Sequence, residues 1–231
     1  MNAKDQALRL LWTGDRRPGR GPQRGLTTER IVAAAIEVVD AEGFAALSMR
    51  RVATKLGVGT ASLYTYLPGK AELAALMLDA VGADDPLPHE HPGDWRAKTE
   101  AWARADWAAF RARPWLLQLV ATAAVPGPNM LRWLDSALSV LDGTGLTAPE
   151  RVAVVETVDA YVRGLARLHV EEAVQAETDR EVLGELVDFT RYPALLEVLR
   201  AGVAPWTGDQ FEFGLQRLLD GVAALIAARS S

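Results

Sequence analysis

Residues 48–67 read SMRRVATKLGVGTASLYTYL, and the spacing of small and apolar residues in this stretch decides the fold. Two short helices cross closely when the residue at their contact is small and the turn between them tolerates positive φ. Ala53 suits the contact, Gly57 suits the turn four residues later, and Leu63 follows as a buried anchor. The pattern predicts a helix-turn-helix whose remaining buried positions are Val52, Leu56, Val58 and Tyr66.

The second helix of this motif, expected over about 59–67, has the composition of a helix that reads DNA. If Gly59, Leu63 and Tyr66 face inward, the residues that face outward are Thr60, Ala61, Tyr64 and Thr65. Methyl groups of Thr and Ala can meet a thymine methyl in the major groove, and hydroxyls can bond base edges or phosphates. Arg50 can reach a guanine edge or a phosphate. Lys70 adds its charge to the N-terminus of the next helix, where a phosphate is favoured.

The rest of the chain is expected to be helical, so the fold class is all-α. Thr27 or Thr28 can cap a helix that ends near Gly43, and Lys70 begins another that ends near Val81. Apolar residues at three- and four-residue spacing predict further helices over about 94–112, 113–123, 128–142, 148–176, 178–200 and 207–228.

Charge and composition divide the chain into three parts. Residues 1–26 include a Gly-, Pro- and Arg-rich stretch and are expected to form a flexible basic arm. Residues 27–83 are expected to form the DNA-binding domain, and residues 84–231 an effector-binding and dimerisation domain. Residues 1–70 hold 11 basic and 6 acidic side chains, whereas the remainder holds 14 and 24. A phosphate backbone would attract the first part and repel the second.

These motifs resemble a known family. The segments GLTTERIVAAAIEVVDAEG and LSMRRVATKLGVGTASLYTYLPGKAEL look like the DNA-binding head of the tetracycline-repressor family, and DAYVRGLA and FEFGLQRLLDGVAAL resemble its C-terminal class. The resemblance implies an all-helical homodimer, with a three-helix helix-turn-helix head, that blocks transcription until a small molecule enters its body. It places groove contacts at Arg50, Thr60, Ala61, Tyr64 and Thr65, and phosphate contacts at Ser48, Tyr66 and Lys70. The sequence departs from the family at Tyr66-Leu67-Pro68-Gly69, where His-Phe and a polar residue are frequent.

Aromatic residues of the body are candidates for an effector site. Three consecutive expected helices carry Trp102, Trp107, Phe110, Trp115 and Trp133, enough to line one cavity for a large, partly aromatic ligand. Tyr161, Arg163 and His169 lie on the following helix as polar partners. The alternative for each aromatic residue is ordinary core packing.

Two helices of the body are candidates for a dimer interface. The helix near 148–176 has apolar residues on two sides, and the last helix offers a similar face at Phe211, Leu215, Leu218, Leu219, Val222 and Leu225. Small residues at Ala160, Gly164 and Gly221 would permit close approach. Two such helices from each subunit would form an isologous four-helix interface; the alternative is burial of both within one subunit.

Several classes of function are excluded or disfavoured. The chain has no Cys, so disulfides and thiolate chemistry are excluded. The segment HEH at 89–91, with Asp84 and Asp85, lacks helical geometry to fix a metal, and no paired nucleophile and base suggests an enzyme. No signal peptide is expected, because residues 1–17 lack an apolar core and carry Lys4, Asp5, Arg9 and Asp15. No membrane span is expected either, because Gln118 and the Pro-Gly-Pro at 126–128 interrupt the longest uncharged stretch.

The sequence therefore predicts a cytoplasmic repressor that binds a palindromic double-stranded DNA operator, needs no cofactor, and is released by a small hydrophobic molecule. The arm is expected to contribute Arg17, Arg20 and Arg24, either by insertion into an A·T-rich minor groove or by general attraction to phosphate. The alternative is a helical DNA-binding protein whose body answers to a protein partner. A ligand-sized cavity favours the first function, and a filled body with an exposed apolar patch favours the second.

Overall fold

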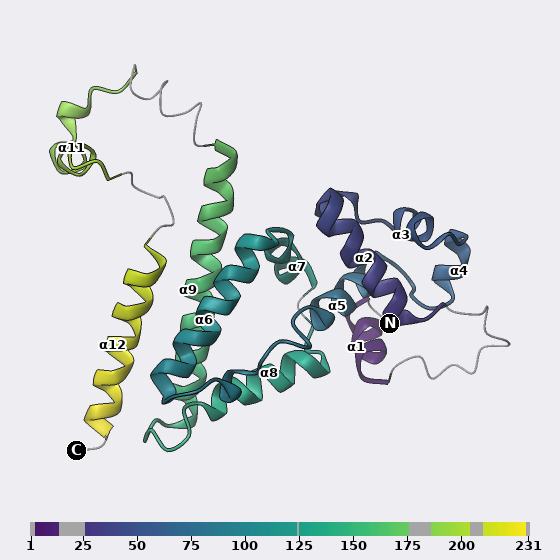
Figure 1. Ribbon diagram of the computed structural model, residues 1–231, viewed down its shortest axis with the longest axis horizontal. Helices are drawn as coiled ribbons and strands as arrows, with labels where there is room; N and C mark the ends of the chain where they lie inside the picture. Colours follow the sequence, from purple (N-terminus) through teal and green to yellow (C-terminus); the bar gives the residue numbers. More distant parts are fainter. Residues whose placement is uncertain (1–2, 14–25, 124, 176–185, 204–209, 230–231) are drawn as a thin grey trace. The chain divides into compact units, whose positions relative to one another are not determined.

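The computed structural model describes residues 3–13, 26–123, 125–175, 186–203 and 210–229, and these form helices without any strand (Figure 1). The expected all-α class is confirmed. The chain packs as two units, residues 1–102 with 113–142 and residues 103–112 with 143–231.

The first unit contains the predicted helix-turn-helix. Helix α2 spans Thr28–Glu42, α3 spans Met49–Leu56 and α4 spans Thr60–Tyr64. The hydroxyls of Thr27 and Ser48 accept the backbone N–H of Arg30 and Arg51, both at 3.2 Å, so each caps its helix as the sequence indicates. Gly57 has φ 68°, the left-handed conformation that the turn requires.

Some, but not all, of the residues predicted to be buried in the helix-turn-helix are buried. Val52, Ala53 and Leu63 are buried, as the spacing predicts. Leu56, Val58 and Tyr66 are only half-buried, and Gly59 is exposed rather than inward-facing. Helix α4 also ends at Tyr64, earlier than expected. Pro68 accounts for only part of this difference, because its ring disfavours helical backbone at Leu67, the residue before it.

An additional helix precedes this domain. Helix α1, Ala3–Thr13, packs against α5, Lys70–Ala80. Ala7 is 3% exposed and clusters with Ala75 of α5 and with Val125, while Leu8 and Leu11 cover the cluster. The expectation of a flexible arm over 1–26 is therefore wrong for α1. Its helical conformation is stabilised because its apolar residues are buried against the rest of the unit.

Three more helices belong wholly or partly to the first unit. The 3₁₀ turn η2, Pro88–Glu90, precedes α6, Trp95–Ala112, which runs from the first unit into the second. Helices α7, Trp115–Ala123, and α8, Pro128–Ser139, belong to the first unit. All three helices lie where the apolar periodicity predicts them.

The second unit is built on two long helices. Helices α9, Ala148–Gln175, and α12, Phe211–Arg229, lie side by side (Figure 1). Between them lie η3, Phe189–Arg191, and α11, Pro193–Arg200. One continuous helix over 178–200 was expected and is wrong for the described part: Asp188 caps η3, and Pro193 lacks the N–H that would continue a helix.

Candidate functional site

The predicted DNA-reading residues lie around one buried anchor. Leu63 is fully buried, whereas Ala61, Thr65 and Tyr64 on and beside α4 are exposed. Tyr64 leaves 53% of its surface accessible, a large value for an aromatic residue. Thr60 is half-buried. Helix α4 thus presents methyl and hydroxyl groups outward, as the spacing predicts.

The flanking contacts predicted from the family resemblance are also accessible. Arg50, Ser48 and Lys70 are exposed, and Tyr66 is half-buried. The Lys70 ammonium lies 5.3 Å from the centroid of the Phe44 ring, a cation–π distance that holds it at the N-terminus of α5. The Ser48 hydroxyl oxygen accepts from a backbone N–H, which leaves its proton available to a phosphate.

The cations of the motif divide into paired and available groups. Arg51 forms an ion pair with Glu42, and Lys55 with Glu37 at 2.8 Å. The hydrogen bond from Arg51 lowers the pKa of the Glu42 carboxyl, so this pair stays charged. Arg50 forms no ion pair with any described residue. The structure thus distinguishes two adjacent arginines: Arg51 is paired with Glu42 of α2, whereas Arg50 is exposed and has no ion-pair partner among the described residues.

Arg17, Arg20 and Arg24 of the basic arm lie outside the residues that the structure describes. Their contribution to DNA binding stays a prediction from sequence.

Three of the predicted effector residues belong to the first unit. Trp102, 2% exposed, meets Trp133 edge-on with ring centroids 5.2 Å apart. Trp115 is 6% exposed and donates its indole N–H to Oδ1 of Asp40 on α2 at 2.8 Å. Trp115 therefore joins α7 to the helix-turn-helix domain, a role that apolar spacing alone did not indicate.

The other four predicted effector residues belong to the second unit, and three of them share one aromatic cluster. Trp107 stacks on Phe211, with centroids 4.8 Å apart and planes 2° from parallel, and His169 lies 5.8 Å from the Trp107 ring. Tyr161 lies 6.1 Å from Phe211. Phe110 is buried. Phe211 was expected at a dimer interface; its burial inside the unit makes it the cluster member that sequence reasoning missed.

Close contact between α9 and α12 orients this cluster. The Tyr161 hydroxyl donates to the carbonyl oxygen of Phe211 at 2.9 Å, and burial raises the pKa of this phenol. A Cβ on Gly214 would overlap the Tyr161 ring, so only glycine permits this approach. The cluster is therefore held in a fixed geometry.

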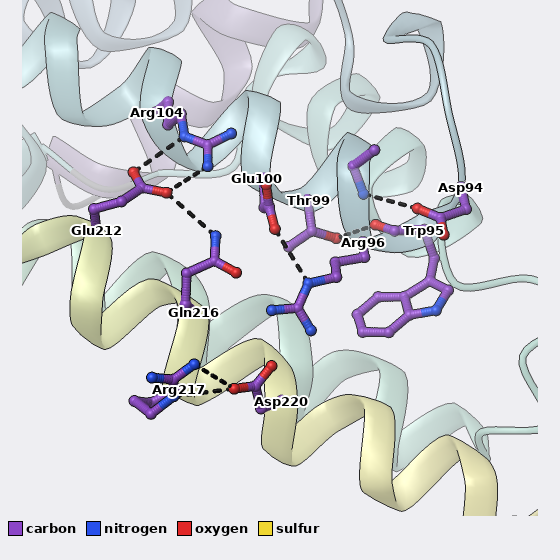
Figure 2. Close-up of polar contacts among 11 residues, drawn as sticks. Asp94, Trp95, Arg96, Thr99, Glu100, Arg104, Glu212, Gln216, Arg217 and Asp220 are labelled. Carbon is purple, nitrogen blue, oxygen red and sulfur yellow. Dashed lines mark hydrogen bonds and ion pairs between the residues drawn. The ribbon is translucent and has the colours of Figure 1, made fainter.

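Charged residues border the aromatic cluster. Arg163 donates through Nε to Oδ1 of Asp159 at 2.7 Å, and desolvation lowers the pKa of its guanidinium. On α6, Arg104 donates through Nη2 to Glu212 at 2.5 Å, and Glu212 also accepts from Gln216 (Figure 2). These bonds tie α6 to the start of α12.

An open apolar groove runs along α9 and α12. Its lining residues are Glu150, Ala153, Val154, Thr157, Leu218, Gly221, Val222 and Leu225. Val154 and Val222 are buried at its floor, while Leu225 is 37% exposed. A Cβ on Gly221 would meet nothing within 4 Å, so the groove has room for a closely approaching surface. Leu215 and Leu219, expected at the interface, are instead buried within the unit.

The disfavoured metal site gains no support from the described residues. His89 bonds through its backbone N–H and Nδ1 to the hydroxyl of Ser136, at 2.9 and 2.7 Å. No group of three or more potential ligands gathers in the described segments. Among these segments, no helix is both long and apolar enough to cross a membrane.

Sequence relatives of the chain are transcriptional regulators. It is 42% identical to the HTH-type transcriptional repressor DrrR1 of Streptomyces coeruleorubidus, over 97% of this chain and 87% of the relative. It is 30% identical to an HTH-type transcriptional regulator of Saccharopolyspora erythraea, over 86% of this chain and 85% of the relative.

Solved structures agree with this relationship. Apo ActR from Streptomyces coelicolor superposes with a TM-score of 0.75 at 28% identity, covering 88% of this chain and 97% of that one. ActR in complex with actinorhodin gives 0.73 at 26% identity, covering 87% and 97%.

Two family models divide the chain between them. The model described as bacterial regulatory proteins, tetR family, matches residues 31–77, which include the helix-turn-helix. The model described as tetracyclin repressor-like, C-terminal domain, matches residues 87–226. The chain therefore belongs to the TetR family of transcriptional regulators.

Proposed function

We propose that this protein is a ligand-responsive repressor that binds a palindromic DNA operator in the bacterial cytoplasm. The observation that carries the proposal is the arrangement of α4, in which exposed Ala61, Tyr64 and Thr65 surround buried Leu63. A helix of this kind fits the major groove, where methyl and hydroxyl groups read base edges. Arg50 and Lys70 supply positive charge on either side of it in the sequence.

The homodimer is part of this proposal, because a palindromic operator matches a twofold protein. The groove along α9 and α12 supports it: Leu218, Gly221 and Leu225 present apolar and small groups that a second copy can cover. The same surface on both subunits would face itself across the twofold axis.

The effector is proposed to be a small hydrophobic molecule with aromatic rings. Trp107, Phe211 and Tyr161 offer flat apolar surfaces, and the polar neighbours Arg163 and His169 can orient a ligand. Phe110 of the same unit and, from the sequence alone, Trp102, Trp115 and Trp133 are further candidates for contact with the effector. The structural relative ActR has been crystallised in complex with actinorhodin. This complex supports the proposal that the present protein also binds a small-molecule effector.

Release of DNA by ligand tests the whole proposal. A fluorescent duplex selected by the protein from a randomised library would be titrated with protein, first alone and then with actinorhodin and other aromatic natural products. We expect at least one compound to weaken the duplex affinity by about 5- to 150-fold, the usual range of allosteric coupling. Tight ligand binding with unchanged duplex affinity would contradict the regulatory part.

A Trp107→Ala variant separates the proposed effector site from the DNA surface. It should keep the duplex affinity and lose the response to ligand, because Trp107 stacks within the aromatic cluster. If every small molecule fails and a cellular protein causes release instead, the alternative of control by a protein partner is favoured.

A further inference from the structure

The C-terminal half of α5 is fastened to the start of α8 by a buried carboxylate. Asp79 is 8% exposed, and its Oδ1 accepts the backbone N–H of Asn129 at 3.1 Å and of Met130 at 3.0 Å. The Asn129 side-chain amide donates to the Asp79 carbonyl oxygen at 3.0 Å. A carboxylate at this position satisfies free N–H groups of the first helical turn and interacts favourably with the helix dipole.

The contact between Asp79 of α5 and the first turn of α8 is called the joint below. Gly127 shows that its two sides are closely fitted. A Cβ at Gly127 would overlap the Asp79 carboxylate, so the backbone approaches the carboxylate only because no side chain intervenes. A further hydrogen bond joins the same two segments: Arg132 of α8 donates to the carbonyl oxygen of Ala83, just after α5, at 2.5 Å. Four groups thus hold residues 79–83 against the first turns of α8.

Helix α1 adds a clasp to the same joint. Ala7 packs between Ala75 of α5 and Val125, two residues before Gly127. The Trp12 indole N–H donates to the carbonyl oxygen of Pro126 at 2.9 Å. The additional helix therefore contacts both partners of the joint, α5 and the segment that leads into α8.

We propose that Asp79, Gly127 and Trp12 are positioning residues that make α5 and α8 one rigid piece and so set the placement of the DNA-reading head. Helix α5 follows the helix-turn-helix directly, and Lys70 at its N-terminus lies beside Phe44 of that domain. A tilt of α5 relative to α8 would carry Lys70 and α4 with it. This inference rests on the proposed function, because its consequence is read in DNA affinity.

The test compares substitutions in the joint with a matched one outside it. Asp79→Asn removes the charge that receives the α8 N–H groups, and Trp12→Phe removes the hydrogen bond to Pro126 together with part of the ring. Asp135→Asn is the control, since it makes the same chemical change at an exposed position of α8 itself. The rate of amide hydrogen exchange at Asn129 and Met130 measures how often the joint opens. Fluorescence anisotropy of the selected duplex measures the DNA affinity of the head.

We expect Asp79→Asn to speed exchange of both amides by about tenfold or more and to weaken duplex binding by about tenfold. Trp12→Phe should weaken duplex binding by roughly threefold, the equivalent of one hydrogen bond, and remains informative if Asp79→Asn does not fold. Asp135→Asn should change neither quantity.

Faster exchange with unchanged duplex affinity in both joint variants would overturn the proposal, because the joint would then be only a structural brace. An unmutated protein that selects no duplex would overturn the proposed function, and this inference with it, before any variant is compared.

Discussion

Trp115 and Asp40 join helices that are far apart in sequence: the indole N–H donates to the carboxylate at 2.8 Å, and Arg113 approaches the same carboxylate at 3.3 Å. The bond links α7 to α2. Trp115→Phe should keep most of the ring packing and lose this bond, at a cost of about 1 kcal/mol in the free energy of unfolding. Urea unfolding measures the loss.

Trp95→Phe is the matched control, because the Trp95 indole bonds to no described residue. An equal loss in both variants would show that the bond to Asp40 contributes nothing beyond ring volume.

The proposed dimer depends on the groove along α9 and α12. Leu218→Arg would place a charge among apolar residues when a second copy covers the groove, so we expect the variant to be monomeric. Sedimentation at micromolar concentration is the measurement. Ala108→Arg, at an exposed position of α6, adds the same charge elsewhere and should remain dimeric. A monomeric unmutated protein would end this hypothesis.

Stability should respond to acid through Glu150. This carboxylate accepts the N–H of Thr147 and pairs with Arg229, which lower its pKa from 4.5 to about 2. A lowered folded-state pKa stabilises the protein above pH 4.5, and the contribution is lost as the pH falls toward 2. Glu150→Gln should therefore reduce the dependence of the melting temperature on pH between 4.5 and 2.

Glu197→Gln, which removes an exposed carboxylate from α11, should leave that pH dependence as it is. Identical melting profiles for the Glu150→Gln variant and the unmutated protein would contradict the assignment.

Local sequence signals predicted the helix-turn-helix because they act within a few residues. The caps at Thr27 and Ser48 and the left-handed Gly57 each satisfy backbone needs of the adjacent helix. The exposed Tyr64 and buried Leu63 follow from helical periodicity once those ends are placed.

Contacts between distant segments could not be predicted in this way. Helix α1 packs against Ala75 and Val125, which lie far along the chain. Asp79 reaches Asn129 across 50 positions. The sequence placed Trp107 among the candidate effector residues, but it could not show that Phe211 would be its stacking partner.

Substitution is the suitable test of the basic arm, because a deletion of residues 1–24 would also remove α1. Replacing Arg16, Arg17, Arg20 and Arg24 by Gln should weaken duplex binding. If the arm inserts into a narrow minor groove, the loss is larger when A·T pairs flank the operator than when G·C pairs do. Equal losses on both flanks at matched salt would leave only general phosphate attraction.

The central claim is that the α4 face and Lys70 bind DNA, and the salt dependence of duplex affinity tests it most directly. Tyr64→Ala and Lys70→Ala should each weaken binding without lowering the melting temperature, because both side chains are exposed. Lys70→Ala should also reduce the slope of log affinity against log salt by about 0.9, the value for one phosphate contact. Arg200→Ala, which removes an exposed charge from α11, should change neither quantity. Unchanged affinity and slope in both head variants would contradict the account.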